Sequence, residues 1–223
     1  MLPVTSYTTL VAAILDLAED VGVELQDYLP VAIDLAEQKL TKELDILGLQ
    51  YVSSPISLGV GVTTITKPAD HKLTYFLRIV NPTTQDETIL ERRQDDYLIE
   101  YWGRSKTPST PKYYSDIDET TFRIVPGSTQ VTSVVVHGVR RPTALSTSNQ
   151  TNTFTRQASN ALLFASMMEV ATWQRNDSMY QKYVVAYNEA RDGLNNEGRR
   201  QRRDNTEAPG NVDPSVNTLL GSN

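Results

Sequence analysis

The sequence contains no cysteine, and this absence excludes several classes of protein at once. Without thiols there is no disulfide framework, no thiolate metal site and no thiol nucleophile. Histidine is nearly as scarce, because only His71 and His137 are present. A metal site would need both of them from distant positions, together with carboxylates. We interpret the two histidines as structural or surface residues and expect no metal and no other cofactor.

Motifs for phosphate binding and catalysis are also missing. Gly59-Val60-Gly61 lacks the third glycine and the following helix of a dinucleotide-binding loop, and it predicts a hairpin turn instead. Asp96 and Glu100, with Asp95 beside them, would share one helix face, as an acid and base pair requires. However, no histidine, lysine or nucleophile lies at motif distance, and capping and solvation explain these carboxylates as well. We predict that the chain is not an enzyme.

Long hydrophobic runs are absent too. The most apolar stretch, Ala158 to Trp173, is shorter than the about 20 residues that span a membrane, and Glu169 lies inside it. The residues from Met1 to Val4 lack the charged region and the cleavage site of a signal peptide. We therefore expect a protein that is made in the cytoplasm and has no membrane partner.

Negatively charged residues outnumber positively charged ones, and the formal net charge is -6. The one dense basic cluster consists of Arg199, Arg200, Arg202 and Arg203. Such cations complement the dipole at a helix C-terminus, and they also suit contact with an acidic protein surface or with nucleic acid. No aromatic residue is interleaved with them, and the acidic remainder of the chain repels a polyanion. Protein contact is favoured, and a nucleic-acid-binding module that uses this cluster is the alternative.

Helical spacing is present at both ends of the chain. The stretch from Ala158 to Trp173 is apolar at nearly every position, which is typical of a helix buried on all sides. After a turn at Asn176-Asp177, a stripe that includes Tyr180, Tyr183 and Tyr187 predicts a second helix. Ser178 and Gln181 could form its capping box. Together these segments predict a C-terminal helical hairpin.

The N-terminal residues predict another hairpin. Its first helix would be capped by Ser6 or Thr8 and run to about Asp20. Its second helix would begin at Asp27, with Pro30 in the first turn, and run to Gly48. One face of these helices is apolar, and the opposite face is expected to be a solvated surface of mixed charge. That charged face is predicted to carry Asp34, Glu37, Lys39, Lys42, Glu43 and Asp45.

The period changes between residues 51 and 138. Short runs rich in Val, Ile, Thr and Tyr are divided there by Pro, Gly, Asp and Asn, which predicts antiparallel strands. Two hairpin loops are predicted, at residues 116–119 and 126–128. Residues 94–102 interrupt the pattern and predict a short helix, with Asp95 and Asp96 at its positive end.

Two polar segments complete the chain. Between residues 143 and 156 lies a Ser, Thr, Asn and Gln tract without periodicity, which we expect to be either functional or mobile. After residue 198 the apolar content is too low for independent folding. Near the end of the sequence Val216, Leu219 and Leu220 form a small apolar motif, which we expect to become ordered on a neighbouring protein.

These elements predict an α+β fold. A helical bundle, built from an N-terminal hairpin (residues 6–48) and a C-terminal hairpin (residues 157–198), would carry an inserted antiparallel β-sheet region (residues 51–138). Residues 1–198 would form a single domain, and residues 199–223 an extended C-terminal tail.

The order of several local patterns resembles that of a known family. The patterns run from Asp95-Asp96-Tyr97-Leu98 and Pro111-Lys112-Tyr113-Tyr114 through Phe122-Arg123-Ile124-Val125-Pro126 to Arg141-Pro142-Thr143-Ala144-Leu145, followed by the apolar helix and the tyrosine stripe. In this order, from about residue 73 to residue 194, the chain resembles the head-to-tail adaptor (connector) proteins of tailed bacteriophages.

The resemblance implies a structural virion protein without enzymatic activity, located in the neck between capsid and tail. It implies docking on the portal protein, association with adjacent adaptor subunits in a homo-dodecameric ring, and contact with downstream tail proteins. It also implies a channel through which genomic double-stranded DNA passes without sequence-specific binding. The arginine cluster and the apolar motif from Val216 to Leu220 are the residues that we expect to contact the portal or a neighbouring subunit.

Overall fold

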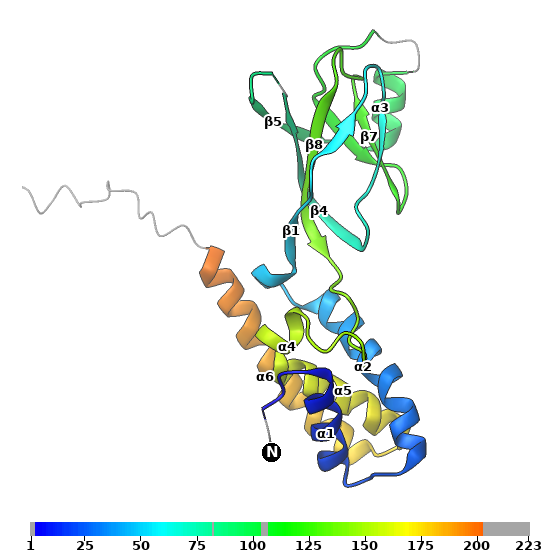
Figure 1. Ribbon diagram of the computed structural model, residues 1–223, viewed down its shortest axis with the longest axis vertical. Helices are drawn as coiled ribbons and strands as arrows, with labels where there is room; N and C mark the ends of the chain where they lie inside the picture. Colours follow the sequence, from blue (N-terminus) through cyan, green and yellow to red (C-terminus); the bar gives the residue numbers. More distant parts are fainter. Residues whose placement is uncertain (1–2, 82, 104–106, 203–223) are drawn as a thin grey trace, which may run out of the picture.

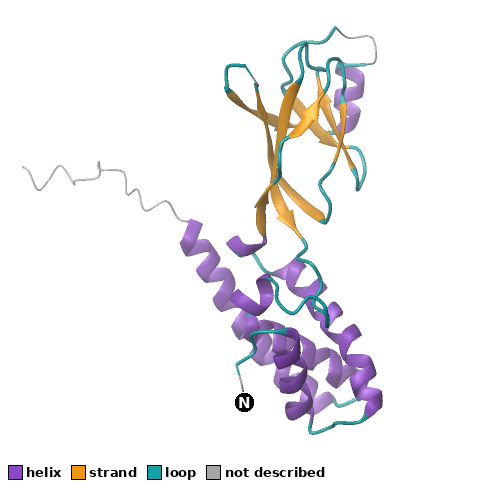
Figure 2. Cartoon of the chain, viewed as in Figure 1, coloured by secondary structure: helices purple, strands orange, loops and turns teal. Residues whose placement is uncertain are grey.

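The structure is a computed structural model that describes residues 3–81, 83–103 and 107–202 of the chain. It has two parts, a group of helices and a twisted β-sheet, which meet at a narrow junction (Figures 1 and 2). The predicted α+β class is confirmed. The sheet is formed by the middle of the chain, and the helices come from the segments before and after it.

The first helix, α1 (Tyr7–Ala18), begins as predicted. The Ser6 hydroxyl accepts a hydrogen bond from the Thr9 backbone N–H at 3.2 Å, and the Thr9 side chain returns a contact to the Ser6 backbone. This is a capping box, which satisfies N–H groups that have no partner inside the helix. The helix ends at Ala18 because Glu19 adopts a left-handed conformation with φ of 52°.

The second helix, α2 (Val23–Glu43), begins earlier than predicted. Pro30 lies inside the helix and not in its first turn. Proline removes one intrahelical hydrogen bond, which costs stability. The buried stripe that starts at Leu25 and continues through Leu29 and Ile33 offsets this cost, because it packs the helix on the core over its whole length. The helix ends at Glu43, before the predicted end at Gly48.

Helix α5 (Ser159–Trp173) lies at the centre of the helical part, as its composition predicted. It packs against α1, α2 and α6 (Asp177–Arg202), and α1 and α2 each pack more closely on α5 than on one another. The predicted capping box of Ser178 and Gln181 is wrong. Asn176 supplies the cap instead, since its side-chain oxygen accepts a hydrogen bond from the Met179 backbone N–H at 3.0 Å.

The strands form one curled sheet in the order β1-β8-β4-β5-β6-β7-β3, with β2 also paired to β8. The two long strands, β4 and β8, form its spine (Figure 1). The strands are β1 (Gln50–Val52), β2 (Ile56–Leu58), β3 (Thr64–Thr66), β4 (His71–Val80), β5 (Glu87–Arg92), β6 (Tyr113–Asp116), β7 (Thr121–Val125) and β8 (Thr132–Arg140). A second apolar core, separate from that of the helices, is buried by this sheet.

The sheet is not purely antiparallel, which corrects the prediction. Strands β5 and β6 pair in parallel, with Glu91 opposite Tyr113, because α3 (Asp95–Tyr101) and the loop after it carry the chain back to the same edge. Helix α3 itself was predicted. Parallel strands need such a crossover, and strand composition alone does not reveal it.

The predicted hairpin loops have different outcomes. The loop at residues 116–119 joins the antiparallel pair β6 and β7, which confirms that prediction. Residues 126–128 do not form a hairpin, because β7 pairs with β3 and β6 whereas β8 pairs with β1, β2 and β4. Residues 59–61 do turn, but the strands on either side, β2 and β3, have different partners.

Hydrogen bonds from side-chain amides within the polar tract after β8 hold that tract in place. The Asn149 side chain donates to the carbonyl oxygens of Thr143 and Ala144, at 3.1 and 2.8 Å. The tract ends in a short helix that the sequence did not predict, α4 (Thr153–Gln157), which is capped by Asn152. This segment forms one of the two connections between the sheet and the helices (Figure 2).

Candidate partner-binding surfaces

The C-terminal end of α6 rests on the segment that follows α2. Gly198 is buried there, and a Cβ atom added to it would lie 2.2 Å from the carbonyl oxygen of Asp45. The Asn195 side chain accepts a hydrogen bond from the Asp45 N–H at 2.8 Å and donates one to the Glu43 carbonyl oxygen at 3.0 Å. Only glycine permits so close an approach of the two backbones.

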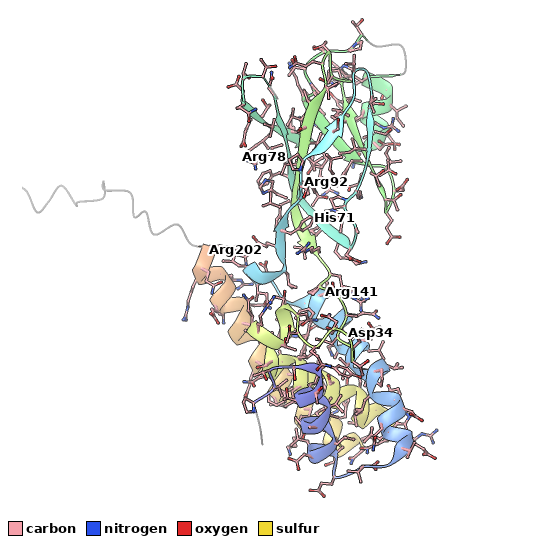
Figure 3. The ribbon with its side chains drawn as sticks, viewed as in Figure 1. Asp34, His71, Arg78, Arg92, Arg141 and Arg202 are labelled. Carbon is pink, nitrogen blue, oxygen red and sulfur yellow. The ribbon has the colours of Figure 1, made fainter. Side chains whose placement is uncertain are left out.

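Arg202 closes this contact (Figure 3). Its guanidinium donates to both carboxylate oxygens of Asp45, at 2.7 and 2.5 Å, and to the Asp45 carbonyl oxygen at 3.0 Å. Two parallel hydrogen bonds of this kind fix geometry as well as charge. Helix α6 therefore continues to Arg202, so residues 199–202, expected at the start of the extended tail, are helical.

Glu43, the last residue of α2, ties α2 to an earlier part of α6. Its carboxylate accepts hydrogen bonds from the Tyr187 hydroxyl at 2.9 Å and from the Arg191 guanidinium at 3.3 Å. Burial raises the pKa of the Tyr187 phenol, and the hydrogen bond to Glu43 raises it further. Tyr187, one residue of the tyrosine stripe of α6, thus has a structural role, with its hydroxyl group paired inside the molecule.

Glu37 was predicted to lie on a solvated face of α2, and this is wrong. Its side chain is only 1% exposed. It accepts hydrogen bonds from the Leu145 backbone N–H at 3.1 Å and from the Asn152 side-chain amide. Burial raises the pKa of the Glu37 carboxyl, and these hydrogen bonds oppose that shift. A buried carboxylate must be paired in this way to be tolerated.

Glu37 is one of two anchors between α2 and the segment after β8. The second is an ion pair between Asp34 on α2 and Arg141 at the end of β8 (Figure 3). The residues on α2 and the residues after β8 are more than a hundred positions apart in the sequence. These contacts fix where the helical part meets the sheet.

A cleft with a volume of about 490 Å³ opens at this junction. It lies between the end of α2, the connection that follows it, and the junction ends of β4 and β8. Leu73 and Tyr75 of β4 are 51% and 41% exposed and line the cleft together with Lys42 and Lys72. The cleft therefore combines apolar and cationic side chains.

The sheet carries an aromatic cluster at its far end, on α3 and β6. Tyr97 stacks on Tyr101 with 5.4 Å between ring centroids, Tyr101 contacts Trp102 at 4.8 Å, and Trp102 contacts Tyr113 at 5.4 Å. We call these four residues the sheet-tip aromatics. Tyr97 and Tyr101 are exposed, and tyrosine and tryptophan are enriched at the centres of protein interfaces.

Of the three carboxylates Asp95, Asp96 and Glu100, Asp95 has structural partners. Asp95 accepts hydrogen bonds from the Arg123 guanidinium at 2.7 Å and from the Ser115 hydroxyl at 2.6 Å. Although burial would raise its pKa, these bonds outweigh burial and lower it. His71 is held between the Tyr51 hydroxyl and the Thr74 hydroxyl, at 2.7 and 2.8 Å.

Among the described residues, no three His, Asp or Glu side chains are grouped in a way that would hold a metal ion. None of the helices in the described ranges is long and apolar enough to cross a membrane.

Comparison with known families identifies the chain's relatives. The family model of the SU10 adaptor protein matches residues 5–213. The chain belongs to the SU10 adaptor protein family. This confirms the predicted resemblance to phage head-to-tail adaptors. Membership gives the adaptor a structural role in the phage particle, in association with other head and tail proteins. A search of curated proteins finds no match to the chain.

The adaptor presents only part of the predicted contact residues to solvent. Arg199 and Arg200 are exposed on the last turn of α6 and have no ion-pair partner among the described residues. Arg202 is engaged by Asp45. The remaining predicted contact residues, Arg203, Val216, Leu219 and Leu220, lie outside the described residues. Their role as contacts stays a prediction.

The cleft at the junction was not predicted from the sequence, because residues from distant segments form it. Lys42 and Lys72 come from a helix and a strand, and no local pattern brings them into one cleft. Three of the sheet-tip aromatics, Tyr97, Tyr101 and Trp102, lie in the segment predicted as a short helix, whereas Tyr113 lies on a separate strand. Their helical spacing did mark Tyr97 and Tyr101 as neighbours, which was the available signal.

Proposed function

We propose that the adaptor is a non-enzymatic subunit of the phage neck that docks on the portal and links the capsid to the tail. The observation that carries this proposal is the separation of two contact surfaces on one elongated molecule. The sheet-tip aromatics lie at the far end of the sheet, and the exposed end of α6 lies beside the junction (Figure 1). A protein that joins two partners needs two such surfaces.

The end of α6 and the residues that follow it would contact the portal or a neighbouring subunit. Arg199 and Arg200 offer two exposed cations without partners among the described residues. Arg203 and the apolar motif of Val216, Leu219 and Leu220 would extend this contact. A segment with few apolar residues gains order only on binding, which suits assembly in a fixed sequence of steps.

The sheet-tip aromatics would contact a downstream tail protein. Exposed tyrosines offer large contact area with little loss of side-chain freedom, and Arg93 lies 5.8 Å from the Tyr113 ring as a cation beside the cluster. The same geometry gives no support to catalysis, because Asp95 and the histidine His71 already have structural partners.

Copies of the adaptor would form a homo-dodecameric ring around the channel for genomic double-stranded DNA. The net charge of -6 supports a channel wall along which DNA slides, since like charges oppose adhesion to phosphates. The location would be the neck of the virion, after synthesis in the host cytoplasm.

Portal binding by deletion variants tests the role of the α6 end. Removing residues 203–223 leaves the Arg202–Asp45 pair intact, so loss of co-purification with the portal would come from the missing segment. A separate full-length variant, R199E/R200E, should also bind the portal more weakly than wild type. The matched control is K182E, an exposed cation elsewhere on α6. Undiminished portal binding by both variants would contradict the proposed contact.

The alternative use of the arginine cluster in nucleic-acid binding has weaker support. Asp45 neutralises Arg202, which leaves fewer cations for phosphates. Salt separates the two uses, because binding through phosphate contacts weakens steeply as salt concentration rises. A DNA affinity that is low and equal in wild type and R199E/R200E is the expected result.

A further inference from the structure

The junction cleft has an apolar side that nothing in the described residues covers. Leu73 and Tyr75 of β4 both line the cleft. Both are exposed, whereas Thr74 between them is buried. The cleft is large enough for several side chains of a peptide segment.

The charges around the cleft are not balanced. Its two acidic residues are already engaged, Glu43 by Tyr187 and Arg191, and Asp45 by Arg202. In contrast, Lys42 and Lys72 are exposed and have no ion-pair partner among the described residues. A ligand of this cleft should therefore be apolar and acidic.

The described chain ends at the rim of this cleft. Arg202 is its last described residue, and it is fixed to Asp45, which lines the cleft. Burial raises the pKa of the Tyr75 phenol, and the charges of Asp45 and Arg202 act on it in opposite directions, so the three groups are neighbours. The residues after Arg202 therefore start beside the cleft.

The composition of those residues matches the cleft. After Arg203 the sequence contains no lysine or arginine, and its charged residues are Asp204, Glu207 and Asp213. Its apolar residues gather near the end, from Val212 to Leu220. Charge and hydrophobicity thus both complement the cleft.

The length of the connection is also suitable. Val216 follows Arg202 by 14 residues, and a flexible chain of that length has an average end-to-end distance of about 20 Å. Binding at the rim where the tether starts is then an intramolecular event, with an effective concentration in the range of about 1 mM for short flexible linkers. Binding to the chain's own cleft is favoured over binding to the cleft of another copy.

We propose that residues 212–220 of the adaptor occupy the junction cleft of the same chain. Val216, Leu219 and Leu220 pack on Leu73 and Tyr75, and Asp213 faces Lys42 and Lys72. The contact holds the C-terminal segment against the adaptor before assembly, and a portal or neighbouring subunit must displace it. Occupancy of the cleft concerns the adaptor alone, whereas displacement of the segment by a portal or neighbouring subunit rests on the proposed function.

Cysteine cross-linking in the full chain tests it, because the natural sequence has no cysteine to interfere. T41C/L219C places one thiol in the cleft and one in the apolar motif. I89C/L219C is the matched control, since Ile89 is an exposed apolar residue of β5 outside the cleft. Under mild oxidation the first pair should link at least about ten-fold faster than the control and yield a product of monomer mass.

Charge reversal and salt provide the second measurement. K42E/K72E in the T41C/L219C background should slow cross-linking to the control rate, and rising salt should slow the unmodified lysine version. Equal rates for the two cysteine pairs, or a product made only of covalent dimers, would overturn the proposal. Neither result would bear on portal binding, which the deletion of residues 203–223 tests separately.

Discussion

Arg202, on the last turn of α6, and Asp45, just beyond α2, form a two-pronged ion pair across 157 positions of sequence. Both side chains keep part of their surface in water, so the pair itself contributes at most about 1 kcal/mol. The main effect of this ion pair is on geometry. Together with the close approach of Gly198 to the Asp45 backbone, it fixes the last turn of α6 beside the junction.

Gly198→Ala should lower the free energy of unfolding by about 1–3 kcal/mol, because the new methyl group overlaps the Asp45 carbonyl oxygen. The control is Gly193→Ala on the same helix, where an added Cβ atom meets nothing within 4 Å. That change should stabilise the helix by up to about 1 kcal/mol. Urea titrations monitored by tryptophan fluorescence measure both, and equal effects would show that α6 does not rest on Asp45.

Asn152→Asp should be strongly destabilising at neutral pH. The capping oxygen of α4 is kept, but a carboxylate then faces the buried Glu37 carboxylate in place of an amide donor. We expect a loss of about 3–5 kcal/mol, the range for an uncompensated buried charge, and a smaller loss as the pH falls and one of the two carboxyls becomes protonated. Asn176→Asp, the same change at the cap of α6, should alter stability by less than about 1 kcal/mol. Similar losses at the two caps would argue against the Glu37 contact.

His71 should make stability fall as the solution is acidified. Burial lowers its pKa below 6.5, and the charge of Lys67 lowers it further, against a weaker opposing effect of Asp116. Between that lowered pKa and 6.5 the unfolded chain binds a proton that the native protein does not, so stability decreases as pH decreases. In His71→Gln this contribution is absent. The difference in unfolding free energy between wild type and variant should therefore shrink from pH 7 to pH 5, and parallel pH curves would refute the assignment.

Tyr101→Ala should affect binding more than stability. Loss of its stacking on Tyr97 and Trp102 costs about 0.5–1.5 kcal/mol of folding free energy. If the sheet tip is a contact surface, removal of a central tyrosine costs 2 kcal/mol or more of binding, which is about a thirty-fold loss of affinity. Recruitment of the adaptor to neck complexes measures this. Val185→Ser, at an exposed apolar position of α6, should leave recruitment unchanged.

Much of the fold follows from local sequence. The helix at α5 was predictable because apolar residues occupy nearly every position, and α1 because Ser6 supplies a recognisable cap. The exposure of Glu37 was predicted wrongly, because a charged residue at the edge of an apolar stripe is normally expected to be solvated. Its partners, Leu145 and Asn152, lie more than a hundred residues away and leave no local signal.

The same limit applies to the sheet and to the candidate surfaces. Periodicity does not detect a helix as short as α4, and strand composition does not show that β5 and β6 are parallel. The arginine cluster was visible in the sequence, but the pairing of Arg202 with Asp45 depends on how α6 crosses the end of α2. The junction cleft depends on the whole fold, because three separate stretches of the chain line it.

The central claim is that the adaptor assembles on the portal as a ring. Mass photometry of the adaptor alone and mixed with portal, followed by electron microscopy of the complex, tests it most directly. We expect discrete complexes in which a ring of adaptors caps the portal, with the sheet tips pointing away from it. An adaptor that stays monomeric in both conditions, and leaves the portal unoccupied, would contradict the account.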